Sequence, residues 1–107
     1  GLQNEKAFLS TDFKVELIRR LEECGFAEVE TTSMVHPKWV PQLADAPEVL
    51  ERLKRFPVET ARTVLVPNRK GLDRALACGA RRVAVFVAAS ESFSRKNTNR
   101  SIAESLQ

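Results

Sequence analysis

The segment Val83–Val87 is apolar at every position, and this constrains the fold more than any other feature of the sequence. Side chains of a strand point alternately to its two faces, so a strand of this composition has to be covered on both. Such strands are typical of parallel sheets with helices on both faces and of closed α/β barrels. The surrounding run, Val83–Ala89, is the longest apolar stretch and is far shorter than the ~20 residues that span a membrane.

Segments with helical and with strand periodicity alternate along the chain. Strands are predicted at 26–31, 63–66 and 83–87. Helices are predicted over 11–24, between Asp45 and Pro57, between Asn68 and Gly79, and from the capping-box sequence Ser101–Glu104 onward. The proline-containing segment 32–44 is predicted to be a long loop. This order implies parallel strands joined by right-handed crossovers.

The spacing of apolar residues predicts which helix faces point inward. In the first helix the predicted stripe is Phe13, Leu17, Ile18, Leu21 and Cys24. In the second and third helices it is Val49, Leu50, Leu53 and Phe56, then Leu72, Ala75, Leu76 and Cys78. Ser10 or Thr11 is expected to cap the first helix. Asp45, with Glu48 three residues later, is expected to form a capping box on the second.

Three strands do not make a complete fold of this class. An open three-stranded parallel sheet exposes two edges, and a closed barrel of βα units takes eight strands. The sequence also begins at Gly1 with no preceding Met and stops at Gln107 within an expected helix. We therefore expect residues 1–107 to be a fragment of one larger α/β domain that self-associates through its open edges.

Polar residues follow each predicted strand, namely Glu30-Thr31-Thr32-Ser33, Pro67-Asn68 and Ser90-Glu91-Ser92. The carboxyl ends of parallel strands meet on one side of the sheet, where α/β folds bind their ligands, so the three clusters together predict one site. Each residue alone is better explained as an ordinary cap or turn. Glu30 is the strongest candidate, because a carboxylate at a strand end needs a cation or a hydrogen-bond donor, and the sequence offers no evident partner.

Composition argues against nucleic-acid binding and against a histidine or cysteine metal site. The net charge of +3 comes from Lys and Arg spread over the whole chain, without Tyr and with one Trp, so no basic patch with aromatics is expected. A few of these cations could face an anionic cofactor such as CoA. His36 is the only histidine, is expected to be exposed beside Pro37, and cannot build a metal site alone. Cys24 and Cys78 match no metal spacing and are expected to be small buried residues.

Several segments together resemble the 3-hydroxy-3-methylglutaryl-CoA lyases. The matching segments are Gly1–Lys6, Glu30–Ser33, Pro37–Gln42, Pro67–Gly71, Ala88–Phe93 and Ser101–Ser105. The Pro-Lys-Trp-Val-Pro-Gln sequence of Pro37–Gln42 is the most specific of them, because it is long and unusual. The resemblance runs over the whole chain. It implies an α/β fold, a partial TIM (β/α)8 barrel with about three parallel strands alternating with four helices.

The resemblance implies retro-aldol cleavage of hydroxymethylglutaryl-CoA to acetoacetate and acetyl-CoA. In this family a divalent cation, typically Mg²⁺ or Mn²⁺, chelates the substrate and, with fixed positive charge, stabilises an alkoxide and an enolate. The family's enolate-stabilising Arg, its metal-binding Asp, Asn and His-x-His residues, and its acidic loop Cys have no counterpart in these residues. The isolated chain is therefore expected to lack lyase activity and a tight Mg²⁺ site.

Only some of the family's site residues carry over. The resemblance implies that Glu30 is a catalytic residue that pairs with the family's Arg, and that Gln3 is a catalytic residue near the substrate. It also implies substrate binding by Ser33 and a contact between Lys6 and the CoA portion. Asn68 and Ser90 are assigned to substrate binding from their strand-end positions.

The chain departs from the family pattern at four positions. Met34 and His36 stand where Phe and Ser are usual, Val87 where Gly is usual, and Arg100 where Cys is common. The branched side chain of Val87 would narrow a pocket at the barrel mouth, which leaves the exact substrate open.

Two other functions remain open. One is a truncated, catalytically silent chain that acts only through self-association or partner binding. The other is a related aldol-type acyl-CoA synthase, against which the Pro37–Gln42 sequence argues. The expected partners are a small acyl-CoA substrate and further copies of the chain in a homo-oligomer, with no nucleic acid and no membrane. The expected compartment is the cytoplasm of a bacterium, or the mitochondrial matrix in a eukaryote.

Overall fold

The computed structural model describes the whole chain, Gly1–Gln107. Its strands are β1 (Glu28–Ser33), β2 (Ala61–Leu65) and β3 (Arg82–Ala84). Its helices are α1 (Thr11–Glu23), α2 (Ala46–Leu53), α3 (Arg69–Ala77), α4 (Glu91–Thr98) and α5 (Ile102–Ser105), with 3-10 turns η1 (Leu2–Asn4) and η2 (Pro41–Leu43). The predicted alternation is confirmed, except that helix α4 was not predicted. None of the helices has the length and apolar character that a membrane span requires.

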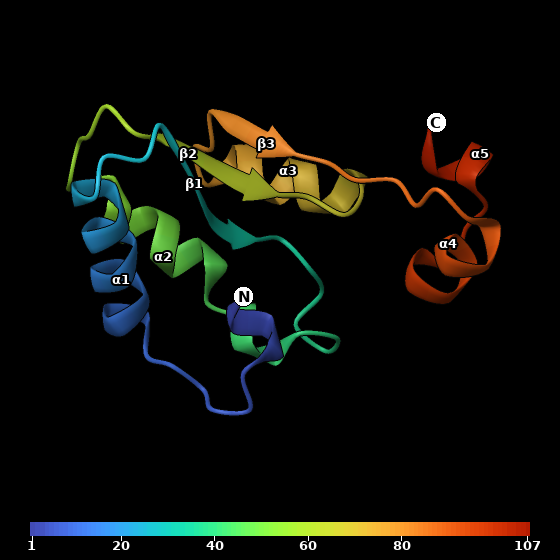
Figure 1. Cartoon of the computed structure of the whole chain (residues 1–107), viewed down its shortest axis with the longest axis horizontal. Coiled ribbons are helices and arrows are strands. Elements are labelled where there is room, and N and C mark those ends of the chain that lie inside the picture. Colours follow the sequence, from blue (N-terminus) through green and yellow to red (C-terminus); the bar gives the residue numbers. More distant parts are fainter.

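The three strands form one sheet in the order β1-β2-β3, and both strand pairs are parallel, as predicted (Figure 1). The register of β1 on β2 shifts between Glu30 and Thr32, which leaves Thr31 as a bulge. The Thr31 hydroxyl donates a hydrogen bond to the carbonyl of Thr63 at 3.1 Å. Glu30 pairs with Thr63 and Thr32 with Val64, so the bulge turns Glu30 and Thr32 to opposite faces of the sheet.

Helices α1, α2 and α3 pack against one face of this sheet. One core cluster joins β1 to α1 and α2, through Val15, Ile18, Val29, Val49 and Leu53. A second joins β2 to α2 and α3, through Met34, Ala46, Leu50, Val64, Val66 and Ala75. By the alternation of strand side chains, the opposite face carries the exposed residues Glu28, Glu30 and Arg82. The covered face is therefore mainly apolar, with the Arg62–Glu22 ion pair buried in it, and the uncovered face carries exposed charge.

The buried face of α1 differs from the predicted stripe. Phe13 is 53 % exposed and Leu21 is 36 % exposed. The buried residues are Lys14, Val15, Ile18 and Glu22. The helix is thus rotated by about one position, because Val15 and Ile18 pack on β1 and α2 while the two charged residues find buried partners. In α3 Leu76 is exposed, although the other three predicted residues point inward.

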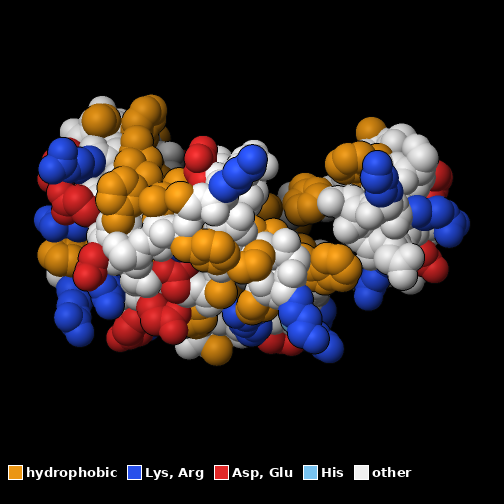
Figure 2. Space-filling view, turned by 90° about the horizontal axis from the view of Figure 1, so that it is seen from below, with side chains coloured by type: hydrophobic (Ala, Val, Ile, Leu, Met, Phe, Trp, Pro, Cys, Tyr) orange, Lys and Arg blue, Asp and Glu red, His pale blue; other side chains and the backbone are white.

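The prediction of a fully covered strand over 83–87 is wrong for this chain. β3 ends at Ala84, and the next residues are exposed, Val85 by 73 % and Phe86 by 45 %. The only neighbour of β3 is β2, which ends at Leu65, so these residues have no strand to pair with. Figure 2 shows hydrophobic side chains at the narrow neck that joins the α4–α5 lobe to the main body.

Candidate functional site

Two of the predicted site residues, Glu30 and Ser33, lie at the carboxyl end of β1, and Asn68 lies at the start of α3 beside it. Gly71, in the first turn of α3, lies against the residue that follows β1. A Cβ atom on Gly71 would come within 3.2 Å of the Met34 carbonyl oxygen and 3.0 Å of Pro67 Cδ, so any larger residue would push these neighbours apart. The approach brings the start of α3 beside the end of β1. Asn68 Oδ1 accepts a hydrogen bond from the Gly71 N–H at 2.9 Å, so its side chain caps α3.

Glu30 lies on the uncovered face of the sheet and has no hydrogen-bond or ion-pair partner in this chain. Glu28, on the same face of β1, accepts a short hydrogen bond from the Thr63 hydroxyl and lies 3.7 Å from Arg82 Nη2. The two carboxylates therefore differ. Glu28 is tied to its own sheet, whereas Glu30, which is nearer the carboxyl end of the strand, is free to bind a cationic group.

Ser33, the last residue of β1, is 4 % exposed, and its hydroxyl has no hydrogen-bond partner. It is the one buried side-chain polar atom of the chain without such a partner. A buried hydroxyl that is left unpaired costs about 1–3 kcal/mol. Ser33 is therefore a buried polar group that residues 1–107 leave without a hydrogen bond.

Gln3 and Lys6 lie in the N-terminal segment, which runs beside the turn η2 (Figure 1). Gln42 Nε2 in η2 donates a hydrogen bond to the Glu5 carbonyl at 2.9 Å and so anchors the segment. Gln3 Oε1 accepts a hydrogen bond from the amino group of Gly1 at 2.7 Å. Gln3 and Lys6 are both exposed, so their side chains are accessible to a ligand.

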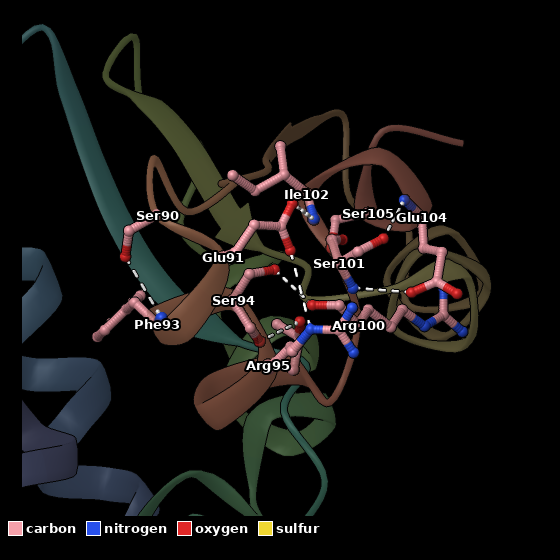
Figure 3. A network of polar contacts seen from close by, with 11 residues as sticks. Ser90, Glu91, Phe93, Ser94, Arg95, Arg100, Ser101, Ile102, Glu104 and Ser105 are labelled. Atoms are coloured by element: carbon pink, nitrogen blue, oxygen red, sulfur yellow. Dashed lines mark hydrogen bonds and ion pairs between the residues drawn. The ribbon is translucent and has the colours of Figure 1, made fainter.

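Ser90 belongs to a separate polar network in the α4–α5 lobe (Figure 3). Its hydroxyl caps α4 by accepting from the Phe93 N–H at 3.3 Å. Glu91 Oε1 accepts from the Ile102 N–H at 3.1 Å, and the Ser94 hydroxyl donates to the Arg100 carbonyl at 2.7 Å. No hydrogen bond or ion pair joins any two of the six predicted site residues, and Ser90 in particular is not brought to the others.

The start of α5 should depend on pH. Ser101 and Glu104 form the predicted capping box, in which the Ser101 N–H donates to Glu104 Oε2 at 2.7 Å. Hydrogen bonding from Ser101, first from its backbone and then from its side chain, holds the pKa of Glu104 below its usual value. Because the folded pKa is lowered, the cap stabilises α5 above the ordinary Glu pKa and is lost as pH falls through the lowered value.

We therefore expect α5 to fray on acidification. Backbone ¹³C shifts of residues 102–105 would report the fraying, and Glu104→Gln would remove the part of their pH dependence that comes from the capping box. Helical shifts in the wild type that persist in acid would contradict the effect.

The residues present do not fit a divalent-cation site. No group of three or more His, Cys, Asp or Glu side chains converges anywhere in the chain. Mg²⁺ takes six oxygen ligands, including one or two carboxylates. His36 is exposed, as predicted, and its Nδ1 accepts from the Lys38 N–H at 3.2 Å. Cys24 is exposed, contrary to prediction, and Cys78 is half-buried.

Buried charges were missed by the sequence analysis. Asp45 makes no capping hydrogen bond on α2, contrary to the predicted capping box. Its carboxylate instead lies 2.5 Å from Lys14 Nζ and accepts from the Thr11 hydroxyl at 2.6 Å. The available signal was the spacing of Lys14, Ile18 and Glu22, which places two charges on the apolar face of one helix.

Comparisons with known proteins cover the whole chain. A family model described as HMGL-like matches residues 1–107. The mitochondrial hydroxymethylglutaryl-CoA lyase of Macaca fascicularis is 53 % identical over 107 residues, which are 100 % of this chain and 33 % of the relative. The cytoplasmic 3-hydroxy-3-methylglutaryl-CoA lyase of Mus musculus is 50 % identical over 106 residues, 99 % of this chain and 31 % of the relative. The chain thus spans about a third of the length of these curated relatives.

Solved structures agree with the fold. The HMG-CoA lyase of Brucella melitensis matches with a TM-score of 0.89 and 51 % identity, over 99 % of this chain and 37 % of that one. The HMG-CoA lyase of Acinetobacter baumannii, solved in complex with coenzyme A and 3-methylmalate, matches with a TM-score of 0.92 and 34 % identity, over 99 % and 34 %. The predicted fold class, part of a TIM barrel with parallel strands alternating with helices, is confirmed.

Proposed function

The chain belongs to the HMGL-like family, as the resemblance in its sequence indicated, and we propose that it forms one wall of the substrate site of a hydroxymethylglutaryl-CoA lyase. The observation that carries the proposal is the unpaired Glu30 on the uncovered sheet face, beside the carboxyl end of a parallel strand. In this fold, that end of the sheet holds the active site. The substrate would be an acyl-CoA, which the coenzyme A in the Acinetobacter baumannii structure supports.

Glu30 would act by holding a cationic side chain against the substrate. When the hydroxyl of hydroxymethylglutaryl-CoA loses its proton to a base, the C–C bond breaks, acetoacetate is released with a new ketone, and the bonding electrons form an enolate of acetyl-CoA. The enolate then takes up a proton. A cation fixed by the Glu30 carboxylate would stabilise that developing negative charge. Ser33 would hydrogen-bond the substrate or a neighbouring group, since its hydroxyl is buried without a partner. Gln3 and Lys6 would contact the substrate and its CoA portion from the N-terminal segment.

The family's divalent cation, Mg²⁺ or Mn²⁺, finds no set of ligands among these residues. It would be held by side chains outside residues 1–107. The side chain of Asn68 caps α3, and that of Ser90 caps α4. Their proposed part in substrate binding is therefore indirect: they would fix the N-termini of these helices at the mouth of the barrel.

A second candidate function is self-association without catalysis. The exposed side chains of Val85 and Phe86 and the two free sheet edges favour it, because such surfaces pair with further strands. A related aldol-type acyl-CoA synthase is the weaker third candidate. The compartment would be cytoplasmic or mitochondrial, since relatives of both kinds match.

Acetoacetate formation from hydroxymethylglutaryl-CoA, with Mg²⁺ present, tests the proposal in two proteins. One is the isolated 107-residue chain, and the other is a graft in which these residues replace the matching segment of the Brucella melitensis lyase. We expect the isolated chain to be inactive and to sediment as an oligomer, and the graft to be active. Acetoacetate from the isolated chain, or a folded graft that releases none, would contradict the proposal.

A further inference from the structure

We propose that Lys14 is a positioning residue, which acts through Gln42 to fix the N-terminal segment Gly1–Lys6 against the turn η2. The inference rests on the proposed function, because that segment carries Gln3 and Lys6. It also makes a prediction about the chain itself that requires no substrate.

Lys14 is buried, with 7 % of its side chain exposed. Its ammonium group lies 2.5 Å from Asp45 Oδ1 and also donates a short hydrogen bond to the Gln42 carbonyl. The other oxygen of Asp45 accepts from the Thr11 hydroxyl at 2.6 Å. Burial of an ammonium group is costly unless the group is paired and hydrogen-bonded. Loss of these contacts would therefore be unfavourable, and they hold the loop before α2 against the N-terminal end of α1.

Gln42 links Lys14 to the N-terminal segment. Its backbone carbonyl accepts a hydrogen bond from the Lys14 ammonium group, and its side-chain amide donates one to the Glu5 carbonyl at 2.9 Å. The hydrogen bonds Lys14–Gln42–Glu5 therefore run without a break from a core helix to the N-terminal segment. In Figure 1 the turns η1 and η2 lie side by side at this junction.

Lys14 cannot itself touch a substrate, because its ammonium group is enclosed and bonded to Gln42 and Asp45. Its effect on the reaction would pass through the position of Gln3 and Lys6. Displacement of a contacting group by ~1 Å can lower a rate by about 10²-fold. The buried pair therefore sets how well the N-terminal segment presents its side chains.

The first test uses the 107-residue chain and backbone ¹⁵N order parameters of residues 2–5. The wild-type values should be about 0.85, and Gln42→Leu, which cuts only the bond to Glu5, should lower them below about 0.6. Lys14→Met should have the same effect, while Lys38→Met, the same change at an exposed lysine of the 34–40 loop, should have none. Unchanged order parameters in Gln42→Leu would overturn the proposal, even if Lys14→Met fails to fold.

The second test measures kcat and KM of Gln42→Leu and Lys38→Met in the graft. We expect Gln42→Leu to lower kcat/KM by about tenfold or more at unchanged thermal stability, and Lys38→Met to leave it unchanged. A disordered segment with undiminished kcat/KM would overturn the positioning role. An inactive parent graft would instead count against the proposed function, while the order parameters would still decide whether Lys14 and Gln42 hold the segment.

Discussion

Arg62→Met is expected to destabilise the chain by about 3–5 kcal/mol, the usual cost of leaving one partner of a buried ion pair alone. Arg62 holds both oxygens of Glu22, at 2.6 and 3.0 Å, and Glu22 has 3 % of its side chain exposed. Arg62 also donates to the carbonyls of Leu53 at 2.6 Å and Phe56 at 2.7 Å, where α2 ends. Methionine would leave a buried carboxylate and the Phe56 carbonyl without a partner, while the Leu53 carbonyl would keep only the Phe56 N–H. Since whole domains have about 5–15 kcal/mol of stability, much of the chain would unfold.

Urea unfolding followed by circular dichroism measures this effect. Arg69→Met is the matched control, because its ion pair with Asp73 is 84 % and 61 % exposed and should contribute about 0–1 kcal/mol. The double variant Glu22→Leu/Arg62→Met removes both charges and should recover part of the loss. If Arg62→Met unfolds at the same urea concentration as Arg69→Met, the pair does not anchor α1 and α2 to β2.

Glu30→Gln in the graft should lower kcat/KM by about 10²-fold or more, because the amide keeps the shape of the side chain and loses the charge that orients a cation. Glu28→Gln is the matched control. It makes the same change two residues away on the same face, at a carboxylate that is already bound to Thr63 and Arg82. Steady-state acetoacetate formation would separate the two. Equal activities for the Glu30→Gln and Glu28→Gln grafts would contradict the role assigned to Glu30.

The order of elements could be predicted from the sequence, because helix and strand periodicities alternate and prolines and glycines mark their ends. Helix α4 was missed because its polar sequence has no apolar stripe, and its start depends on the Ser90 cap. The face of α1 was wrong for a different reason. Phe13 and Leu21 suggested an apolar stripe, yet the pairing of Lys14 with Asp45 and of Glu22 with Arg62 makes the adjacent face the buried one.

The candidate site could be predicted only in part. The strand-end position of Glu30 and Ser33 indicated that both belong to the candidate site. The bulge at Thr31, which turns Glu30 and Thr32 to opposite faces of the sheet, has no signature in the local sequence. Asn68 and Ser90 have the cap roles that such residues usually have. The hydrogen bonds from Lys14 through Gln42 to Glu5 join parts of the chain that are far apart in sequence. The spacing of apolar and polar residues within a single helix cannot predict such contacts.

The products that the graft releases from hydroxymethylglutaryl-CoA test the central claim most directly. If residues 1–107 form one wall of a C–C lyase site, acetoacetate and acetyl-CoA should appear in equal amounts, without free CoA, at a rate that Glu30→Gln greatly reduces. Release of free CoA without acetoacetate, or acetoacetate at a rate that does not depend on Glu30, would contradict the account.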